Sequence, residues 1–158
     1  MSDLVGLDAL AARDRPSVRR AIARVLRAAG APKGAVSVAL VDDDTIRALN
    51  RAHRKKDKAT DVLSFTLDDD GLPAGFDHLL GDVVVSVDTA ARQARAHDHA
   101  LSVEIAVLVA HGVAHLLGHD HERGPAFARA QAECELTFLD AAGVPLDAAL
   151  IGRALVDG

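Results

Sequence analysis

The sequence predicts a single α+β domain, α/β-like in character, in which a small mixed β-sheet packs against helices. Short segments rich in Val and other apolar residues, with the length of strands, lie between residues 35 and 87, and segments with helical periodicity surround them. With 158 residues and no long linker, the chain has the size of one domain, so residues 1–158 are taken as a single unit.

The N-terminal third predicts a helix followed by a strand. A helix is expected from Pro16 to about Ala29, because proline suits a first helical turn and Gly30 follows the last one. The segment Ala35–Val41 is rich in Val and is expected to be a strand. The segment Leu4–Leu10 is compatible with either an additional strand or a helix.

The middle of the chain predicts two further strands. Asp42-Asp43-Asp44 supplies a turn and an N-cap for a short helix that ends near Asn50. A basic loop is expected over Arg51–Lys58. The segments Asp61–Leu67 and Asp82–Val87 are expected to be strands, the second with the clearer pattern.

The C-terminal half is expected to be helical. The helix that Ser102 is expected to cap is apolar almost all round, so it should lie at the centre of the domain. Asp88-Thr89 is the expected cap of the helix before it. The four expected helices are Asp88–His97, Ser102–Gly118, Gly124–Ala142 and Leu146–Val156.

Three histidines near the end of the central helix predict a metal site. His111 and His115 are four residues apart, a spacing that places both imidazoles on one helix face. Gly118 lets the chain turn back, because glycine tolerates positive φ, and His121 can then return to the same point. Three neutral imidazoles with an open fourth position are typical of a catalytic zinc site, with one zinc per chain.

The spacing of these histidines matches the metzincin zinc peptidases, which indicates a zincin-like arrangement on the central helix. Those enzymes carry a glutamate general base directly after the first histidine, where this chain has Gly112. They also need a methionine turn, and Met1 is the only methionine here. The motif therefore favours zinc and disfavours ordinary zinc proteolysis; the alternative is a solvated, His-rich helix end.

The composition of the chain bears on where the protein is located in the cell. No apolar run approaches the ~20 residues of a membrane span, and the N-terminus lacks the pattern of a secretory signal. The only cysteine, Cys134, is expected to be a packing residue, and a single cysteine fits a reducing cytoplasm. We therefore expect a cytoplasmic protein without a membrane partner.

Charge is distributed unevenly along the chain. The total of −5 alone argues against nucleic-acid binding, but residues 13–58 contain 13 basic and 5 acidic residues, a net charge of +8. Such a segment can present a basic face to a polyanion, although a solvated basic surface is the alternative. The candidate substrate-binding residues are those of the basic loop: Arg51, Arg54, Lys55, Lys56 and Lys58.

Three segments together resemble the YbeY-type family of bacterial endoribonucleases, the rRNA maturation factors. They are residues 54–65, which end in Thr60-Asp61-Val-Leu-Ser-Phe65, residues 80–86, and the histidine segment 111–121. The resemblance spans about 90 residues, from 49 to 139. Where the family usually has proline and tyrosine, this chain has Ala59 and His119.

The resemblance implies a single-strand-specific endoribonuclease that acts in 16S rRNA 3′-end maturation and in ribosome quality control. It implies that zinc is bound by His111, His115 and His121, and that Arg54 is catalytic. The implied partners are single-stranded RNA and rRNA, the small ribosomal subunit with its proteins, and a ribosome-assembly GTPase.

Two other functions remain open at this point. One is a zinc-dependent hydrolase of a peptide or amide, and the other is a non-catalytic ribosome-assembly factor with structural zinc. The proton acceptor is equally open among Asp61, Asp120 and a zinc-bound hydroxide. So is the nucleophile, which is water or the RNA 2′-hydroxyl.

Overall fold

A four-stranded mixed sheet forms the middle layer of the protein. The computed structural model describes residues 4–31, 35–66, 80–118 and 124–145. Three strands run parallel, and the last is antiparallel to its neighbour. In spatial order the strands are β1 (Leu4–Val5), β2 (Val36–Val41), β4 (Gly81–Ser86) and β3 (Val62–Phe65). The predicted small mixed sheet is confirmed.

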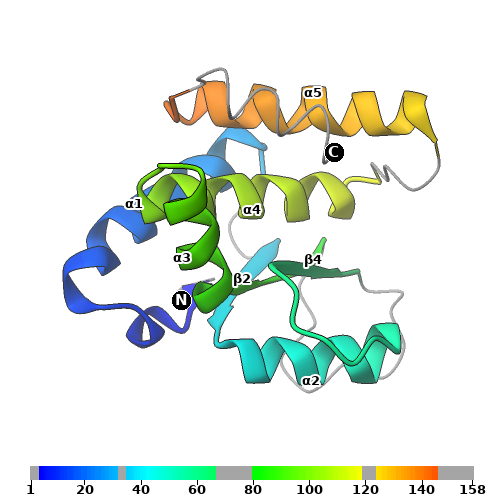
Figure 1. Ribbon diagram of the computed structural model, residues 1–158. Coiled ribbons are helices and arrows are strands. Elements are labelled where there is room, and N and C mark those ends of the chain that lie inside the picture. Colours follow the sequence, from blue (N-terminus) through cyan, green and yellow to red (C-terminus); the bar gives the residue numbers. More distant parts are fainter. Residues whose placement is uncertain (1–3, 32–34, 67–79, 119–123, 146–158) are drawn as a thin grey trace.

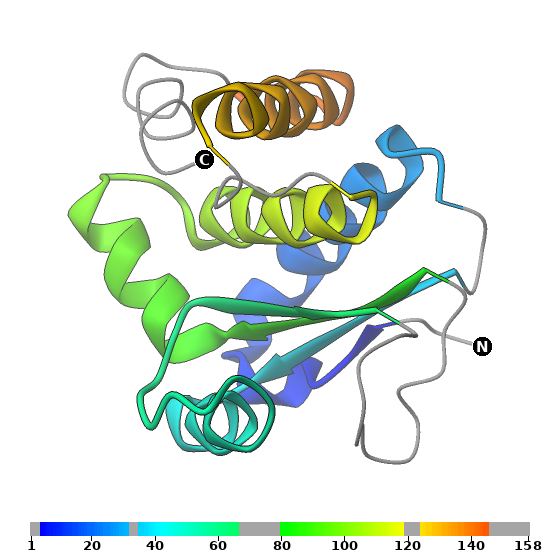
Figure 2. The same ribbon diagram turned by 90° about the vertical axis from the view of Figure 1, so that its right-hand side faces the viewer.

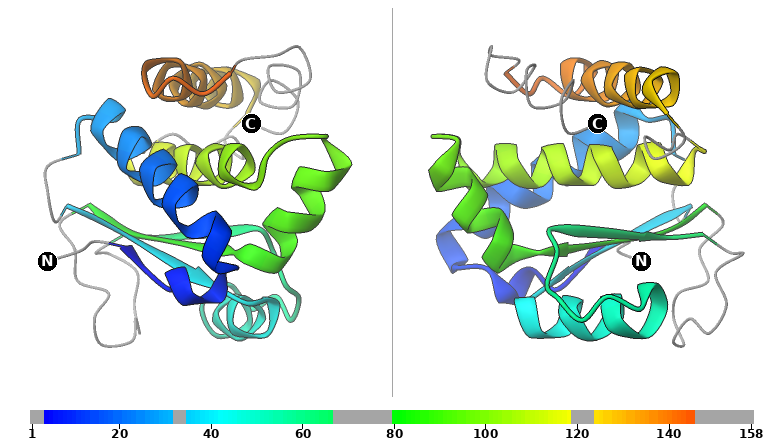
Figure 3. Two further views of the ribbon diagram at one scale, coloured as in Figure 1. Left: turned by 90° about the vertical axis from the view of Figure 1, so that its left-hand side faces the viewer. Right: turned by 45° about the vertical axis from the view of Figure 1, so that its right-hand side comes forward.

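Helices cover both faces of this sheet (Figures 1 and 2). One face carries α4, which α1 and α3 flank on opposite sides (Figure 3), and α5 packs on the far side of α4. Of the described α-helices, α2 lies on the other face. The helices are α1 (Arg15–Ala28), α2 (Asp43–Arg54), α3 (Val87–Ala96), α4 (Leu101–Leu116) and α5 (Pro125–Ala141).

The side chains of β4 point alternately to the two faces of the sheet, so this strand contributes to the core on both faces. Val83 and Val85 belong to the larger apolar cluster, which α1 and α4 complete. Val84 points the other way, into the smaller cluster with Ile46 of α2. All six residues of β4 are buried, as expected for a strand covered on both faces.

Helix α4 is the centre of the domain, as its composition predicts. Eleven of its 16 residues are buried. Within the described residues, no single helix is long and apolar enough to cross a membrane; α3 and α4 meet those criteria only together, and a 115° bend separates them. Cys134 of α5 is partly buried against the core, and burial raises the pKa of its thiol.

Two predicted helix caps are wrong. Helix α3 begins directly where β4 ends, so Ser86 is its cap and accepts a hydrogen bond from the Thr89 N–H at 3.2 Å. Helix α4 begins at Leu101, before the predicted cap, so Ala100 is the cap residue and Ser102 lies in the first turn. Local sequence does not show how far a strand runs before the next helix starts.

Other boundaries also differ from the prediction, most clearly those of α2 and β3. Helix α2 continues to Arg54, so the first half of the expected basic loop is helical. The helix extends this far because its inner face, which packs on the protein, includes the half-buried His53. Strand β3 is shorter than expected. Residues 4–10 form the short β1 followed by a 3₁₀ turn at Leu7–Ala9. The helix expected at 146–156 lies outside the described residues.

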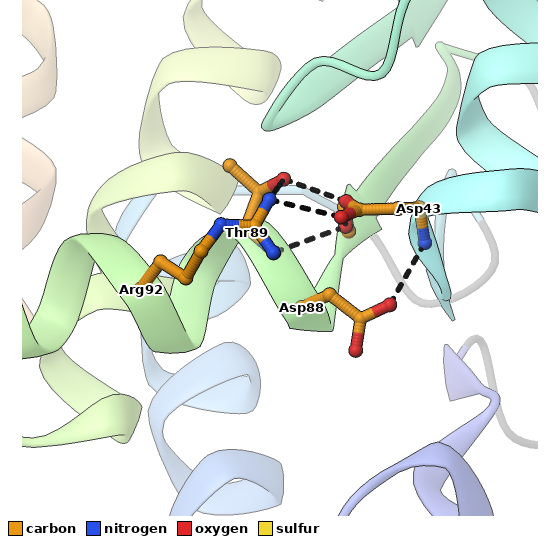
Figure 4. Close-up of polar contacts among 5 residues, drawn as sticks. Asp43, Asp88, Thr89 and Arg92 are labelled. Atoms are coloured by element: carbon orange, nitrogen blue, oxygen red, sulfur yellow. Dashed lines mark hydrogen bonds and ion pairs between the residues drawn. The ribbon is translucent and has the colours of Figure 1, made fainter.

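A polar network joins the N-termini of α2 and α3 (Figure 4). The Asp43 carboxylate accepts hydrogen bonds from Ser86 Oγ at 2.6 Å, Thr89 Oγ1 at 2.7 Å and Arg92 Nη2 at 2.9 Å. In return, Asp88 Oδ2 accepts the backbone N–H of Asp43 at 2.9 Å. The hydrogen bond from Ser86, with those from Thr89 and Arg92, lowers the pKa of Asp43 although partial burial opposes the shift.

Candidate active site

A cleft of about 490 Å³ opens between α2, β3 and the C-terminal half of α4. It brings together predicted site residues from distant parts of the sequence: Arg54, Lys56 and Lys58 on one side, His111 and His115 on the other. Arg51 and Lys55 are exposed but are not part of its lining. The described residues that line the cleft are Asn50, Arg54, Lys56, Lys58, Thr60, Asp61, Val62, Leu63, Ser64, His111 and His115.

His111 and His115 lie side by side in the last turns of α4. Their ring centroids are 4.9 Å apart and the ring planes are inclined by 70°. Gly118 follows the helix with φ of +97°, so the chain leaves the helix at the predicted glycine. His119, Asp120 and His121 lie outside the described residues.

Helix α5 supports His111 from behind the cleft. Glu135 Oε1 and Oε2 each lie 3.2 Å from His111 Nδ1. The amide nitrogen of Gln131 lies 3.0 Å from the same Nδ1. Both α5 residues are buried, and neither was singled out from the sequence. Their only sequence signal is a pair of polar residues four apart on the helix face that continues into Leu139.

Arg54 is anchored although it is exposed. Its Nη2 donates to the Ser64 carbonyl oxygen at 2.6 Å, and its guanidinium carbon lies 4.9 Å from the centroid of the Phe65 ring. The contact with the ring is a cation–π interaction. Both contacts hold the guanidinium against β3 at the edge of the cleft.

The segment that follows α2 is tied back to that helix. Asn50 is buried, and its Nδ2 donates to the Lys58 carbonyl oxygen at 3.0 Å. Arg47 pairs with Asp57 through two contacts of 2.9 and 3.2 Å, and this pairing lowers the pKa of Asp57. These contacts hold Lys56 and Lys58 at the cleft. Asn50 was missed by sequence reasoning because its partner is a backbone group.

Packing explains why glycine occupies position 112. A Cβ built on Gly112 would lie 2.6 Å from Val83 Cγ1 of β4. The carbonyl oxygen of Gly112 also accepts a hydrogen bond from Ser64 Oγ at 3.1 Å. Helix and sheet are in direct contact here, so the glutamate that zinc peptidases carry at this position does not fit.

Asp61 contributes a carboxylate to the cleft wall. Its Oδ1 accepts from the Val62 N–H at 2.8 Å and its Oδ2 accepts from Gln93 Nε2 at 3.2 Å. These bonds orient the carboxylate between β3 and α3. Of the two aspartates considered as proton acceptors, Asp61 lines the cleft, and Asp120 lies outside the described residues.

The donor set suits zinc more than a hard cation. Two imidazoles line one cleft, and His111 has a buried carboxylate at its other nitrogen, the arrangement common for zinc-binding histidines. Within residues 4–31, 35–66, 80–118 and 124–145, no three His, Cys, Asp or Glu side chains are grouped to hold a metal. The predicted third ligand, His121, lies outside these ranges.

Comparisons with known proteins agree with this architecture. The Endoribonuclease YbeY of Anaeromyxobacter dehalogenans (strain 2CP-C) is 47% identical over 147 residues, covering 93% of this chain and 71% of that protein. The Endoribonuclease YbeY of Aquifex aeolicus (strain VF5) is 52% identical over 99 residues, covering 63% and 64%.

A solved structure shares the fold. The solution structure of TM1509 from Thermotoga maritima superposes with a TM-score of 0.56 at 23% identity, covering 88% of this chain and 87% of that one. The family model described as Endoribonuclease YbeY matches residues 10–138. The chain therefore belongs to the endoribonuclease YbeY family.

Proposed function

We propose that this protein is a zinc-dependent endoribonuclease that cuts single-stranded RNA. One observation carries the proposal: a single cleft combines two histidines at zinc-ligand spacing with Arg54, Lys56 and Lys58. Relatives that match most of the chain are named endoribonucleases. We further propose that it acts in the cytoplasm on 16S rRNA 3′ ends and in ribosome quality control, with the small subunit, its proteins and an assembly GTPase as partners.

The basic side of the cleft suits a phosphodiester. Cleavage builds negative charge on the non-bridging phosphate oxygens, and a guanidinium matches two such oxygens with two parallel N–H groups. Arg54 already contacts Ser64 and Phe65, so its charge is oriented before substrate binds. A preorganised cation of this kind stabilises the transition state more than a freely solvated one.

His111, His115 and His121 would hold the zinc, which supplies a bound water with pKa near 7 and polarises a phosphoryl oxygen. His111 and His115 orient their rings into the cleft from one helix face. Asp61 is oriented by Val62 and Gln93 and lies where it can accept a proton within the cleft.

A peptidase is the weaker alternative. The position of the peptidase base is occupied by Gly112, and packing against Val83 excludes a larger side chain there. A peptide substrate would also give no reason for the cationic wall. A non-catalytic assembly factor would need a structural zinc, and such sites are usually closed by four protein ligands.

The test is cleavage of end-labelled single-stranded RNA, with elemental analysis of the same preparations. We expect about one zinc per chain, and loss of both zinc and cleavage in His111→Ala and His115→Ala. His121→Ala should lose far more zinc than His119→Ala. Full zinc in either α4 variant would contradict the site, and zinc-loaded protein that binds ribosomal subunits but leaves RNA intact would support the assembly factor instead.

A further inference from the structure

We propose that Glu135 is a positioning residue of this site, which fixes the tautomer and orientation of His111 so that Nε2 faces the cleft. The inference rests on the proposed function, because it takes zinc to be the ligand that Nε2 would bind. It assigns a role to α5, a helix that contributes no side chain to the cleft lining.

The first step concerns the hydrogen between Glu135 and His111. Both carboxylate oxygens lie 3.2 Å from His111 Nδ1, and an ionised carboxylate only accepts hydrogen bonds. Nδ1 must therefore carry the hydrogen, which leaves Nε2 as the basic nitrogen of the neutral ring. Zinc binds a histidine through that unprotonated nitrogen.

The second step concerns burial. The Glu135 side chain is 4% exposed, whereas that of His111 is 21% exposed and lines the cleft. A buried carboxylate is costly unless a partner satisfies it, and the Nδ1–H of His111 is such a partner. The Nδ1 edge of the ring therefore faces Glu135, and this contact opposes a ring flip that would exchange the two nitrogens.

The third step concerns Gln131, one helical turn before Glu135. Its side-chain amide lies against the ring, with Nε2 at 3.0 Å from His111 Nδ1 and 3.5 Å from His111 Nε2, and the residue is fully buried. Because an N–H group cannot donate to a nitrogen that carries a hydrogen, the tautomer with the hydrogen on Nδ1 requires this amide to present its oxygen to the ring. Two side chains of one helix thus hold the same imidazole. Carboxylates behind zinc-binding histidines increase the donor strength of the ring, and their removal lowers metal affinity by about 10- to 100-fold.

The molecule contains a matched pair away from the cleft. Glu104 of α4 is fully buried, and its Oε1 lies 3.3 Å from Nδ1 of His97. His97 is not part of the cleft lining. Glu104→Gln therefore reproduces the loss of a buried Glu–His contact without touching the proposed zinc site, and Glu133→Gln removes an exposed charge from α5 itself.

The experiment compares wild type with Glu135→Gln, Glu104→Gln and Glu133→Gln, using zinc affinity from competition with a fluorescent chelator. We expect zinc binding about 10- to 100-fold weaker in Glu135→Gln and nearly unchanged in both controls. The second readout needs no zinc: long-range ¹H–¹⁵N NMR of the zinc-free wild type at about pH 8, above the ordinary His pKa. His111 should carry its hydrogen on Nδ1.

Two results would overturn the inference. One is folded Glu135→Gln that binds zinc as tightly as wild type, and the other is a His111 hydrogen on Nε2 in the zinc-free protein. If Glu135→Gln does not fold, the wild-type tautomer and Glu135→Asp decide the question. Wild type that binds no zinc would refute the zinc site itself, whereas normal wild-type binding with an unaffected Glu135→Gln refutes only the role of Glu135.

Discussion

At the scale of single residues, the cleft combines side chains that the fold holds in different ways. His111 is fixed by contacts from a neighbouring helix, whereas Arg54 is fixed by its own strand neighbours, Ser64 and Phe65. Lys56 and Lys58 are exposed, and their position depends on the hydrogen bond from Asn50 to the Lys58 carbonyl oxygen and on the ion pair between Arg47 and Asp57. The lysines can therefore follow a substrate, while the arginine and histidine present a fixed geometry.

Replacing Arg54 tests this difference. Arg54→Ala should lower RNA cleavage about 100-fold or more, the scale for losing a preorganised charge donor, with zinc content nearly unchanged. Arg54→Lys should not restore full activity, because an ammonium group lacks the planar fork that binds phosphate bidentately. Single-turnover cleavage rates and elemental analysis are the measurements. Cleavage at the wild-type rate in Arg54→Ala would reduce Arg54 to a surface charge.

Sequence reasoning found the histidines and Arg54 but not the residues that support them. His111 and His115 are recognisable because helical spacing alone places them on one face. Glu135 and Asn50 act through contacts between elements, with an imidazole on another helix and a carbonyl in a following loop. Such contacts depend on how the helices pack, which the residues of one element do not reveal.

At the scale of elements, the site depends on how closely α4 approaches the sheet. Gly112 lets the helix touch Val83 of β4, and the same contact brings Ser64 Oγ to the Gly112 carbonyl oxygen. The two histidine-bearing turns of α4 are thereby held against β3, the strand that carries the partners of Arg54. The basic and histidine sides of the cleft are set by one helix–sheet contact.

Substitutions at Gly112 and Val83 can test that contact. Gly112→Ala should lower the free energy of unfolding by about 1–3 kcal/mol, the usual effect of overpacking. Removing the opposing methyl groups with Val83→Ala should make the second substitution less harmful, so the double mutant should be more stable than additivity predicts. Chemical denaturation of the four proteins measures the coupling. Strictly additive effects would show that the two residues do not compete for the same space.

The junction of α2 and α3 should make stability depend on pH. Because hydrogen bonds lower the pKa of Asp43 in the folded protein, its contribution is present above the unfolded value of about 3.9 and is lost as pH falls through the lower folded value. Denaturation of zinc-free protein should thus show Asp43→Asn less stable than wild type by about 1 kcal/mol at pH 7, with the difference shrinking in strong acid.

Asp44→Asn is the control for that measurement, since Asp44 is an exposed neighbour on the same helix. It should follow the pH profile of the wild type. A constant difference between Asp43→Asn and wild type across the acid range would exclude a role for the Asp43 charge.

The predictions of helices and strands were correct where a periodic pattern of apolar residues identified the element, and they were wrong at the ends of the elements. The Val-rich strands and the apolar α4 were predictable because burial on two faces leaves a clear pattern. The caps at Ser102 and Asp88-Thr89 were wrong because capping depends on where the preceding residue turns, and Asp88 instead contacts the Asp43 backbone. The length of α2 was underestimated because the basic residues after Asn50 were interpreted as a loop, whereas the helix continues to Arg54.

At the scale of the whole molecule, an acidic protein places three cationic side chains at one cleft. The net charge is −5, yet Arg54, Lys56 and Lys58 line the proposed RNA site. Long-range repulsion from the acidic remainder therefore opposes RNA binding, and the local attraction must exceed it. Binding should be strongly salt-dependent, because each phosphate that is neutralised releases counterions.

Charge reversal in the cleft tests this balance. Lys56→Glu with Lys58→Glu should weaken RNA binding and flatten its dependence on salt concentration, by about one unit of slope for each lost phosphate contact. Arg19→Glu with Arg27→Glu, on the exposed face of α1, is the matched control and should leave the slope nearly unchanged. Fluorescence anisotropy with a labelled RNA over a salt series provides the slopes, and zinc content should be equal in all variants.

The order of the strands also affects how the chain folds while it is being synthesised. Strand β2 pairs with β1 and with β4 but not with β3, the strand that follows it in sequence. Val36 therefore cannot pair with Gly81 until β4 has been made, and the apolar face of α1 is not covered until α4 has been made. Local contacts cannot complete the core, which is typical of slower folding. On the translating ribosome, Val18, Ile22 and Val25 therefore stay uncovered until the histidine-bearing helix has emerged, and the nascent chain needs protection from aggregation during that interval.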